Sequence, residues 1–455
     1  MKGPWTAQPL SRVLVYGLGA SGLAAARLLR AHGVEVVGVD RRPAAEVAAE
    51  LAGLAIDLRA GGEPTVLPAG IDAVVVSPGV PASRPLLAAA RAAGVPVLAE
   101  VELAFPFLNG PLIGITGSNG KSTTTALTGE LLRRAGFAVE VCGNIGRPLA
   151  SCVEGAPGRV FVVELSSFQL EAIATLRPRA AAVLNVSPDH LDRHGSLQAY
   201  AAAKLRLLQN QHREDVAVLN AEDPLVADAP TAARRRRFAL GGPVDDGCFL
   251  DSGAVVEARP GEPRRELFRQ SDLPLVGLHN LENAMAAALL ALALGAEPAA
   301  LASGLRDFHA LPHRMEKVGE WDGVAWFDDS KGTNVGATAK SLAGFPDRAV
   351  HLILGGRNKG ADLRELRPVV ARKVARLYLI GESADDFRRA LGDVVASEMA
   401  RTLERAVRLA AEHGSAGQAV VLSPACASFD QFRDFNDRGE QFQRLVRGLH
   451  AGARA

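Results

Sequence analysis

The sequence predicts an α/β protein of three domains, each built on a largely parallel sheet with crossover helices. Three stretches of the chain alternate short apolar runs with helical patterns, which is typical of parallel sheets. Two glycine-rich loops each follow an apolar run and precede a helical pattern. The chain has 455 residues. At roughly 150 residues per domain, its length also predicts about three domains.

The first stretch predicts a Rossmann-like domain over residues 1–104. An apolar run at Val13–Tyr16 is followed by a glycine-rich turn and a helical pattern that reaches Ala31. Gly33 ends this helix, and the next apolar run, Val34–Val39, predicts a second strand. Further strands are expected at Ala73–Val76 and Val95–Leu98, before a boundary near residues 100–109.

The second stretch predicts a P-loop ATPase-like domain over residues 105–310. Its expected strands are Leu112–Thr116, Arg159–Val163, Ala180–Val186 and Val216–Asn220. Helices are expected at Leu197–Asn210 and at Ala284–Ala296. The second is the most apolar stretch of the chain, but it is too short to span a bilayer and is interpreted as a buried helix. The segment Arg234–Val256 predicts loops and short antiparallel strands. Its arginines, Arg234–Arg237, are interpreted as a solvated charged loop rather than an anion site.

The third stretch predicts a second Rossmann-like domain over residues 311–455. Apolar runs that alternate with helical patterns indicate another open α/β sheet. The expected strands are Val324–Phe327, Val350–Leu354, Leu377–Ile380 and Val420–Leu422. Three such sheets in series favour binding sites in crevices at the strand ends.

The overall composition argues against several classes of protein. Lys and Arg total 51 and Asp and Glu total 50, so the formal charge of +1 disfavours a nucleic-acid binder. Hydrophobic residues make up 48% and charged residues 22%, which disfavours disorder. The four cysteines form no CxxC pair, and the N-terminus lacks a signal-peptide pattern. We therefore expect a cytoplasmic protein that does not associate with membranes.

The first glycine-rich loop, Gly17–Gly22, reads GLGASG and matches GxGxxG between a strand and a helix. Glycines let the backbone approach a pyrophosphate, and the helix N-terminus supplies N–H donors. Asp40 lies at the end of the next strand, where a carboxylate can meet a ribose hydroxyl. The loop therefore indicates a binding site for a dinucleotide or a nucleotide-sugar diphosphate. The alternative is a tight turn from strand to helix that binds no ligand, which would have the same sequence pattern.

The second loop is the stronger signal, because it reads GITGSNGKST from Gly114 to Thr123. Ile115 takes the first glycine position of the strict P-loop pattern. The rest of the motif still predicts a cradle for phosphates, with Lys121 reaching them and Ser122 able to bind Mg²⁺. An enzyme that uses ATP to activate a nucleotide-linked substrate needs both loops, whereas a simple dehydrogenase or ATPase needs one.

Polar residues follow several of the predicted strands, where functional side chains of doubly wound sheets gather. Glu164 is a candidate for binding Mg²⁺ or the γ-phosphate, because hard cations prefer carboxylate oxygens. His190 alone is typical of a loop histidine, and Lys204 alone is typical of a solvated helix face. The segment DDSKGTN predicts either a site or a capped helix start. Arg314 is suited to a phosphate contact.

Taken in order, seven segments resemble the Mur ligase family, and the resemblance covers essentially the whole chain. They are GITGSNGKST, VVELSSFQLE, NVSPDHLDRHGS, LVGLHNLENAMAA, LPHRMEKVG, DDSKGTN and LSPACASFDQF. The last, together with GGRNKGADL, most resembles the members that add D-glutamate. The resemblance implies that ATP phosphorylates the carboxylate of UDP-N-acetylmuramoyl-L-alanine and that D-glutamate then attacks the acyl phosphate, a cytoplasmic step of peptidoglycan precursor synthesis.

The resemblance also implies a role for each domain: the first binds the UDP-sugar, the second ATP and the third the amino acid. ATP would be bound by Gly117, Ser118, Asn119, Gly120, Lys121, Ser122, Thr123, Asn283, Arg314 and Asp329. The UDP-substrate would be bound by Gly17, Gly19, Ser21, Gly22, Asp40, Arg42, Ser77, Gly79 and Asn144. D-glutamate would be bound by Thr333, Lys359, Ser428 and Phe435.

By the same resemblance, the catalytic residues would be Lys121, Glu164, His190, Lys204 and Lys331. Mg²⁺ would be held by Ser122, Glu164, His190 and Lys204, the last as N6-carboxylysine formed with CO₂. Burial of Lys204 would favour the neutral amine that reacts with CO₂. The resemblance further implies a monomer that acts on small molecules.

Two other interpretations belong to different classes of function. A nicotinamide-dependent oxidoreductase would use the first loop but leaves Lys121, Glu164 and the third domain unexplained. A nucleotide-regulated binding protein would not need the polar clusters of the third domain. Within the family, another Mur-type amino-acid ligase is the closest alternative.

Overall fold

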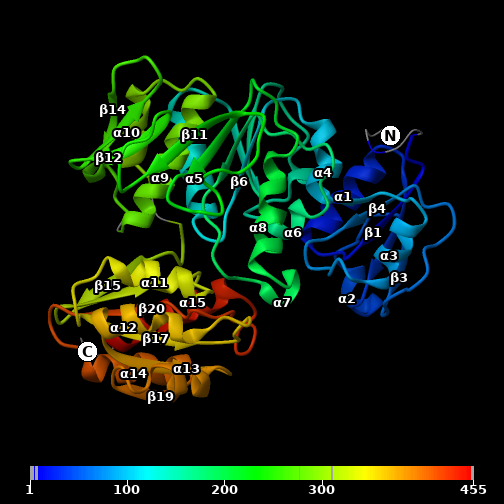
Figure 1. The fold of residues 1–455 in the computed structure, drawn as a ribbon. Helices are drawn as coiled ribbons and strands as arrows, with labels where there is room; N and C mark the ends of the chain where they lie inside the picture. Colours follow the sequence, from blue (N-terminus) through cyan, green and yellow to red (C-terminus); the bar gives the residue numbers. More distant parts are fainter. Residues whose placement is uncertain (1–4, 6–8, 276, 309–310, 452–455) are drawn as a thin grey trace. The chain divides into compact units, whose positions relative to one another are not determined.

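The computed structural model describes residue 5 and residues 9–275, 277–308 and 311–451, which fall into two compact units. The first unit takes its residues from 1–186, 198–272 and 282–306, and it contains two sheets (Figure 1). The second takes its residues from 187–197, 273–281 and 307–455, and it contains the third sheet. The expectation about a leader at the N-terminus lies largely outside the described residues.

The N-terminal sheet has five parallel strands in the order β3-β2-β1-β4-β5, as expected for a Rossmann-like domain. Its strands are β1 (Arg12–Tyr16), β2 (Glu35–Asp40), β3 (Asp57–Ala60), β4 (Ala73–Val76) and β5 (Val97–Ala99). Its helices are α1 (Ala20–Ala31), α2 (Ala44–Ala48), α3 (Pro85–Ala92) and α4 (Glu100–Ala104), followed by η1 (Phe105–Phe107). The strand order reverses between β1 and β4, which places a crevice at their carboxyl ends.

The central sheet has nine strands in the order β14-β13-β12-β11-β10-β9-β6-β8-β7. The strands from β7 to β12 in this order are parallel, and β13 and β14 extend the sheet antiparallel. The parallel strands are β6 (Leu112–Thr116), β7 (Val139–Gly143), β8 (Val160–Glu164), β9 (Ala180–Val183), β10 (Val216–Asn220), β11 (Arg234–Ala239) and β12 (Gly247–Asp251). The other two are β13 (Ala254–Ala258) and β14 (Arg265–Arg269).

The chain between and after these strands forms the remaining helices of this region. They are α5 (Lys121–Arg134), η2 (Leu149–Ser151), α6 (Ser167–Leu170), α7 (Leu191–His194), α8 (Leu197–Leu205), η3 (Arg206–Leu208), η4 (Gln270–Asp272), α9 (Leu278–Ala293) and α10 (Ala299–Arg306). The buried helix predicted at Ala284–Ala296 is confirmed as part of α9, whose residues 284–291 are fully buried. Within the described part of the chain, no helix combines the length and apolar character that a membrane crossing requires.

Two details of the central sheet correct the sequence analysis. The predicted strand to Val186 ends at Val183, because the backbone N–H of Val186 instead bonds to Asp223 at 2.7 Å. The arginines interpreted as a solvated loop form β11, which pairs parallel with β10. Arg236 is buried and forms ion pairs with Asp246 and Glu257, both of which come from later parts of the chain.

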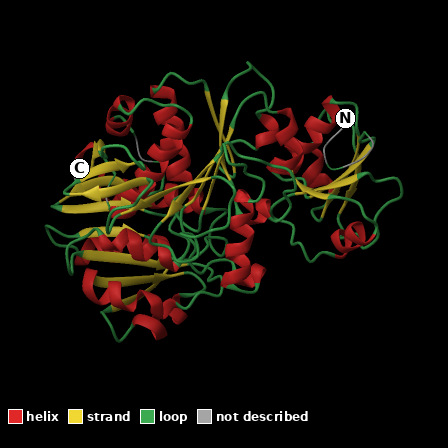
Figure 2. Cartoon of the chain, turned by 45° about the horizontal axis from the view of Figure 1, so that its top comes forward, coloured by secondary structure: helices red, strands yellow, loops and turns green. Residues whose placement is uncertain are grey.

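The third sheet has six strands in the order β15-β16-β20-β17-β18-β19, with β15 antiparallel and the rest parallel. They are β15 (Glu316–Trp321), β16 (Val324–Asp328), β17 (Val350–Gly355), β18 (Val374–Ile380), β19 (Ser397–Arg401) and β20 (Ala419–Leu422). The helices are α11 (Val335–Ala343), η5 (Leu363–Leu366), α12 (Arg367–Lys373), α13 (Ala384–Leu391), α14 (Leu403–His413) and α15 (Phe435–Ala451), which Figure 2 shows beside the strands.

Alternate residues of the central strand β17 point to opposite faces of this third sheet. Leu352 and Leu354 pack in one apolar cluster and Ile353 in another, so helices bury both faces. The loops that carry polar side chains leave from the carboxyl ends of β16, β17 and β20. The topology therefore gathers those loops at one edge of the sheet.

Candidate active site

The phosphate loop connects β6 to the start of α5 and can be built only with glycine at one position. Gly120 has a φ of +83°, in the left-handed region that glycine tolerates best. A Cβ atom there would lie 2.2 Å from Oδ1 of Asn283, which also accepts a hydrogen bond of 3.3 Å from Thr124. Asn283 comes from α9, so the fold brings this predicted nucleotide-binding residue onto the loop.

Asn185 holds the loop from the other side, and the sequence analysis assigned it no role. Its backbone carbonyl accepts a hydrogen bond of 2.9 Å from the N–H of Ser118. Its side-chain oxygen accepts another of 2.9 Å from the N–H of Asn119, and its amide nitrogen donates to the Asn119 carbonyl at 3.2 Å. The sequence did contain a signal for this role: Asn185 is a polar residue just after a buried strand, at the carboxyl end where functional side chains of such sheets gather.

Lys121 is the first residue of α5, and its ammonium folds back over the loop. It donates hydrogen bonds of 2.9 Å to the carbonyl of Gly117 and 3.0 Å to that of Ser118. Ser122 follows in the first turn of the helix and is 5% exposed. The cation and the helix N-terminus thus act on the same small space, which is the electrostatic arrangement that binds phosphate oxygens.

Lys204 lies under the phosphate loop, and the interpretation of it as a solvated residue is wrong. Its side chain is only 1% exposed, because α8 packs this face against the loop. The Nζ atom donates a hydrogen bond of 2.7 Å to the carbonyl of Gly117 and lies 4.3 Å from the centre of the Tyr200 ring. Lys204, Tyr200 and Gly117 all belong to the first compact unit.

Glu164 ends β8, directly beside β6, and is 2% exposed. Asn144 donates a hydrogen bond of 2.8 Å from its amide nitrogen to Oε1 of this carboxylate, and its backbone N–H donates 2.9 Å to the Glu164 carbonyl. Gly143 permits this approach, because a Cβ there would lie 2.3 Å from the Glu164 carbonyl oxygen. Asn144, predicted to contact the UDP-substrate, thus orients a predicted metal ligand.

A crevice with a volume of about 410 Å³ opens where the first sheet reverses its strand order. It is lined by seven of the nine residues predicted to bind the UDP-substrate: Gly17, Gly19, Ser21, Asp40, Arg42, Ser77 and Gly79. Gly22 does not line it, because its role is packing: a Cβ there would lie 1.9 Å from the Gly17 carbonyl oxygen. The first glycine-rich loop therefore lines a cavity, as a ligand-binding loop would.

Asp40 is held in this crevice by hydrogen bonds from its surroundings. The N–H of Leu18 donates to it at 2.8 Å, and Arg42 forms an ion pair with it at 3.1 Å. Burial raises the pKa of Asp40, but the hydrogen bonds from Arg42 and Leu18 outweigh it and leave the pKa below its usual value. Arg42 also pairs with Glu50 at 3.0 Å, which fixes the cation at the rim.

Asp329 and its neighbours occupy the loop after β16 in the second unit. Asp329 accepts hydrogen bonds of 2.7 Å from each of the hydroxyls of Ser341 and Ser423. Burial raises its pKa to about 6, against those hydrogen bonds and the charge of Arg314. The structure therefore places this predicted nucleotide-binding residue inside the domain, where it anchors the loop that carries Lys331.

Lys331 stands over an aromatic ring rather than in open solvent. Its Nζ atom lies 3.5 Å from the centre of the Phe435 ring, a cation–π contact. Arg438, which the sequence analysis missed, is fully buried and donates to the carbonyls of Ser330 at 2.8 Å and Cys426 at 3.3 Å. These bonds tie the loop after β16 to the loop after β20.

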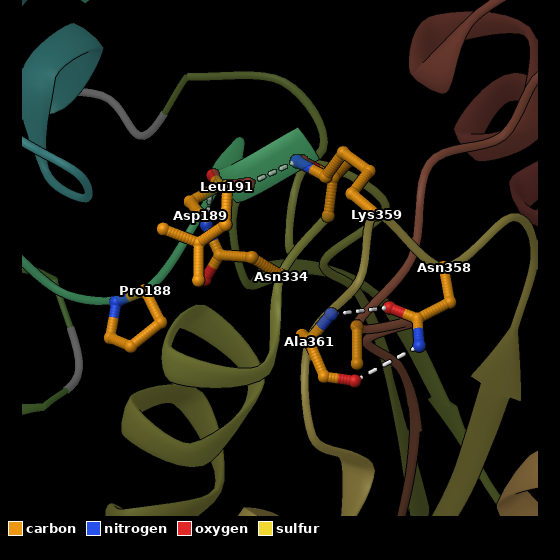
Figure 3. A pocket seen from close by; sticks show the side chains of 9 residues that line it. Pro188, Asp189, Leu191, Asn334, Asn358, Lys359 and Ala361 are labelled. Atoms are coloured by element: carbon orange, nitrogen blue, oxygen red, sulfur yellow. Dashed lines mark hydrogen bonds and ion pairs between the residues drawn. The ribbon is translucent and has the colours of Figure 1, made fainter. Parts of the chain in front are cut away.

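A narrow pocket in the second unit is lined by Pro188, Asp189, Leu191, Thr333, Asn334, Asn358, Lys359, Ala361 and Ala425. Two of the four residues predicted to bind D-glutamate, Thr333 and Lys359, line it, whereas Ser428 and Phe435 do not. Asp189 and Lys359 form an ion pair of 2.6 Å in this pocket (Figure 3). His190 follows with a left-handed φ of 53° at the start of α7.

Comparison with protein-family models matches most of the chain. Residues 11–99 match a Mur ligase MurD-like N-terminal domain, residues 115–291 a Mur ligase middle domain, and residues 313–426 a Mur ligase glutamate ligase domain. The chain belongs to the Mur ligase family. Its three α/β domains are those of the family.

Curated relatives match the chain over nearly its whole length. It is 47% identical to the UDP-N-acetylmuramoylalanine–D-glutamate ligase of Anaeromyxobacter dehalogenans, over 96% of this chain and 97% of that one. It is 46% identical to the ligase of the same name from Myxococcus xanthus, over 96% and 98% of the two chains.

Solved structures at low identity share the fold. A pseudomurein peptide ligase type C from Methanothermus fervidus matches with a TM-score of 0.62 at 18% identity, over 96% of this chain and 100% of that one. The UDP-N-acetylmuramate–alanine ligase MurC from Thermotoga maritima matches with a TM-score of 0.61 at 18% identity, over 97% and 99%.

Proposed function

We propose that this chain is an ATP-dependent ligase that joins D-glutamate to UDP-N-acetylmuramoyl-L-alanine in peptidoglycan precursor synthesis. The observation that carries the proposal is the phosphate loop, because Lys121, Lys204 and Glu164 all lie on or beside it. An oxidoreductase that used only the first crevice would have no use for this second site. The 47% and 46% identities to D-glutamate ligases support this particular member of the family.

In the proposed reaction, a carboxylate oxygen of UDP-N-acetylmuramoyl-L-alanine attacks the γ-phosphorus of ATP, and the bond to ADP breaks. The amino nitrogen of D-glutamate then attacks the acyl carbon of the resulting acyl phosphate. The C–O bond to phosphate breaks, and the nitrogen loses a proton. Both steps bring anions together, so cations and backbone N–H groups that stabilise phosphate charge supply much of the catalysis.

The residues assigned to ATP have the chemistry that this role requires. The N–H groups of the loop 117–120 and the ammonium of Lys121 bind phosphate oxygens, and Asn283 buttresses the loop. Ser122 and Glu164 offer the oxygen atoms that Mg²⁺ prefers. Bound there, Mg²⁺ neutralises phosphate charge. His190 is proposed as a further ligand, and Ser118, Asn119, Thr123, Arg314 and Asp329 as further parts of the nucleotide site.

Carboxylation of Lys204 is proposed because the chain resembles the Mur ligase family, and the burial of this lysine supports the proposal. An ammonium that is 1% exposed has lost its hydration, and loss of hydration favours the neutral amine that can react with CO₂. The product would be a carbamate whose oxygens suit a divalent cation, in the position that Nζ now occupies beside the carbonyl of Gly117.

The two remaining substrates are assigned to the other domains. The crevice of the first domain, proposed to span residues 1–104, would bind the UDP-sugar through its glycine-rich loop, with Asp40 and Arg42 at the rim. Residues 105–310 would form the ATP-binding domain and residues 311–455 the amino-acid domain. In the last, Thr333, Lys359, Ser428 and Phe435 would bind D-glutamate, and Lys331 would assist catalysis. We further propose a cytoplasmic monomer.

Phosphate release from ATP tests the proposal. Release should require both UDP-N-acetylmuramoyl-L-alanine and D-glutamate, and L-alanine or a diamino acid should not replace D-glutamate. Lys121→Ala should abolish release while leaving binding of the UDP-sugar unchanged. Release that ignores both substrates would contradict ligation, and loss of NADH absorbance on mixing would favour the oxidoreductase.

A further inference from the structure

The pocket of the second unit contains one anion and one cation in direct contact. Lys359 comes from the turn after β17, and Asp189 comes from the segment just before α7 (Figure 3). Their nitrogen and oxygen lie 2.6 Å apart, and their side chains are 19% and 7% exposed. Thr333 and Asn334 line the same hollow. The pocket therefore presents two opposite charges to whatever enters it.

The carboxylate of Asp189 is aimed by neighbours rather than left to rotate. The amide nitrogen of Asn334 donates to its Oδ2 at 3.1 Å, and the backbone N–H of His190 donates to its Oδ1 at 2.9 Å. Asn334 is itself fixed, because its Oδ1 caps α11 by accepting from the N–H of Ala337 at 2.7 Å. A carboxylate held in this way offers a defined position for a positively charged group.

A ligand that is only anionic would suit this pocket poorly. If a carboxylate took Lys359 away from Asp189, the buried aspartate would lose the cation at 2.6 Å and keep the more distant imidazole of His190 at 3.7 Å, and removing the close partner of a buried charge is unfavourable. A ligand that carries an ammonium beside its carboxylate supplies both missing charges at once. The pocket is thus matched to an amino acid and mismatched to a simple dicarboxylic acid.

We propose that Asp189 binds the α-ammonium of the incoming D-glutamate while Lys359 binds a carboxylate of the same molecule. The ion pair seen here opens when the amino acid enters, and each partner exchanges the other for the opposite charge of the substrate. This inference rests on the proposed function. It adds a residue that selects an amino acid over its analogues without nitrogen and that positions the nitrogen, which attacks after the ammonium has lost a proton to solvent.

The test compares D-glutamate with glutarate, which keeps both carboxylates and lacks the amino group. Asp189→Asn should raise the KM for D-glutamate by at least about tenfold and leave the inhibition constant of glutarate unchanged or lower. Lys359→Met should weaken both ligands by at least about tenfold, because it removes the carboxylate partner. The KM for ATP should change by less than about twofold in both variants.

Asn334→Ser provides a matched control, because serine keeps the helix cap and removes the amide that aims Asp189. It should raise the KM for D-glutamate less than Asp189→Asn does. A second measurement needs no variant: in the wild-type protein, glutarate and D-2-hydroxyglutarate should bind at least about tenfold more weakly than D-glutamate. Thermal unfolding of each variant checks that the chain is folded.

The outcomes separate this inference from the function on which it rests. If the wild-type protein releases no phosphate in response to D-glutamate, the proposed function is wrong. If it does, but Asp189→Asn weakens glutarate as much as D-glutamate, the carboxylate is structural and the inference is wrong. Equal binding of glutarate and D-glutamate to the wild-type protein would overturn it as well.

Discussion

The Nζ atom of Lys204 donates a hydrogen bond of 2.7 Å to the carbonyl of Gly117, so a lysine on α8 supports the phosphate loop from below. Lys121 donates to the same carbonyl at 2.9 Å. Two lysines from separate helices therefore meet at one backbone oxygen. The hydrogen bond from Lys204 ties the phosphate loop to α8. Replacement or chemical modification of Lys204 should therefore affect how the loop binds phosphate.

Lys204→Met should lower the rate of phosphate release by about 10²-fold or more, because it removes a buried group beside the phosphate loop. Steady-state release with saturating substrates measures the effect. Lys317→Met is the control, since Lys317 is half exposed and forms a surface ion pair with Glu320. If Lys204 acts as a carbamate, wild-type activity should also fall in CO₂-depleted buffer and return with bicarbonate. A rate indifferent to CO₂ would count against carboxylation.

Gly120→Ala should abolish ATP turnover, because the added methyl group would collide with Asn283 at 2.2 Å. The strain of a left-handed alanine adds about 1 kcal/mol. Gly136→Ala is the matched control: its φ of +88° carries the same strain, but nothing lies within 4 Å of the new atom. Nucleotide affinity and thermal unfolding should be measured for both. Equal losses in the two variants would show that strain, not the collision, is responsible.

Asn185→Ala should raise the KM for ATP by about tenfold, because it removes the side-chain amide that accepts from the N–H of Asn119 and donates to the carbonyl of the same residue. Asn210→Ala serves for comparison, since Asn210 also bonds to backbone carbonyls but lies away from the loop. Initial rates at varied ATP concentration provide the measurement. An unchanged KM for ATP in Asn185→Ala would mean that Asn185 does not shape the loop.

The buried carboxyl group of Glu100, which lies outside the candidate active site, should make the stability of the protein depend on pH. It is 1% exposed and accepts a hydrogen bond of 2.5 Å from the N–H of Ala150. Burial raises its pKa to about 7, against the effect of that hydrogen bond. Because the folded-state pKa lies above the unfolded value, the folded chain holds the proton more tightly. Stability should therefore fall as pH rises from about 4.5 to 7.

Glu100→Gln keeps an acceptor for Ala150 and removes the titration. Between pH 5 and pH 8, the free energy of unfolding of the variant should rise by about 1–3 kcal/mol relative to wild type. Urea unfolding at the two pH values provides the comparison. A difference between the two proteins that does not change with pH would show that Glu100 stays ionised in the folded chain.

Patterns in short stretches of sequence were enough to predict the structural features that are set by residues adjacent in the chain, namely the glycine-rich loops and the buried strands. Both glycine-rich loops were found because a strand, a glycine run and a helix follow one another directly. The buried strands β1, β6, β8, β10 and β17 were found because both faces of each are covered, which leaves continuous apolar runs. The edge strands β3, β7, β15 and β19 were missed, because their half-exposed residues mix polar and apolar types.

What the sequence by itself determined was the α/β class, the two phosphate-type loops and the family. Tertiary structure alone decided that Arg236 is buried, because its counter-ions come from elsewhere: Asp246 lies just before β12, and Glu257 lies in β13. It also decided that Lys204 lies under the phosphate loop and that Asp189 meets Lys359. Burial and charge pairing depend on partners distant in the chain, and no local pattern records which partners folding will supply.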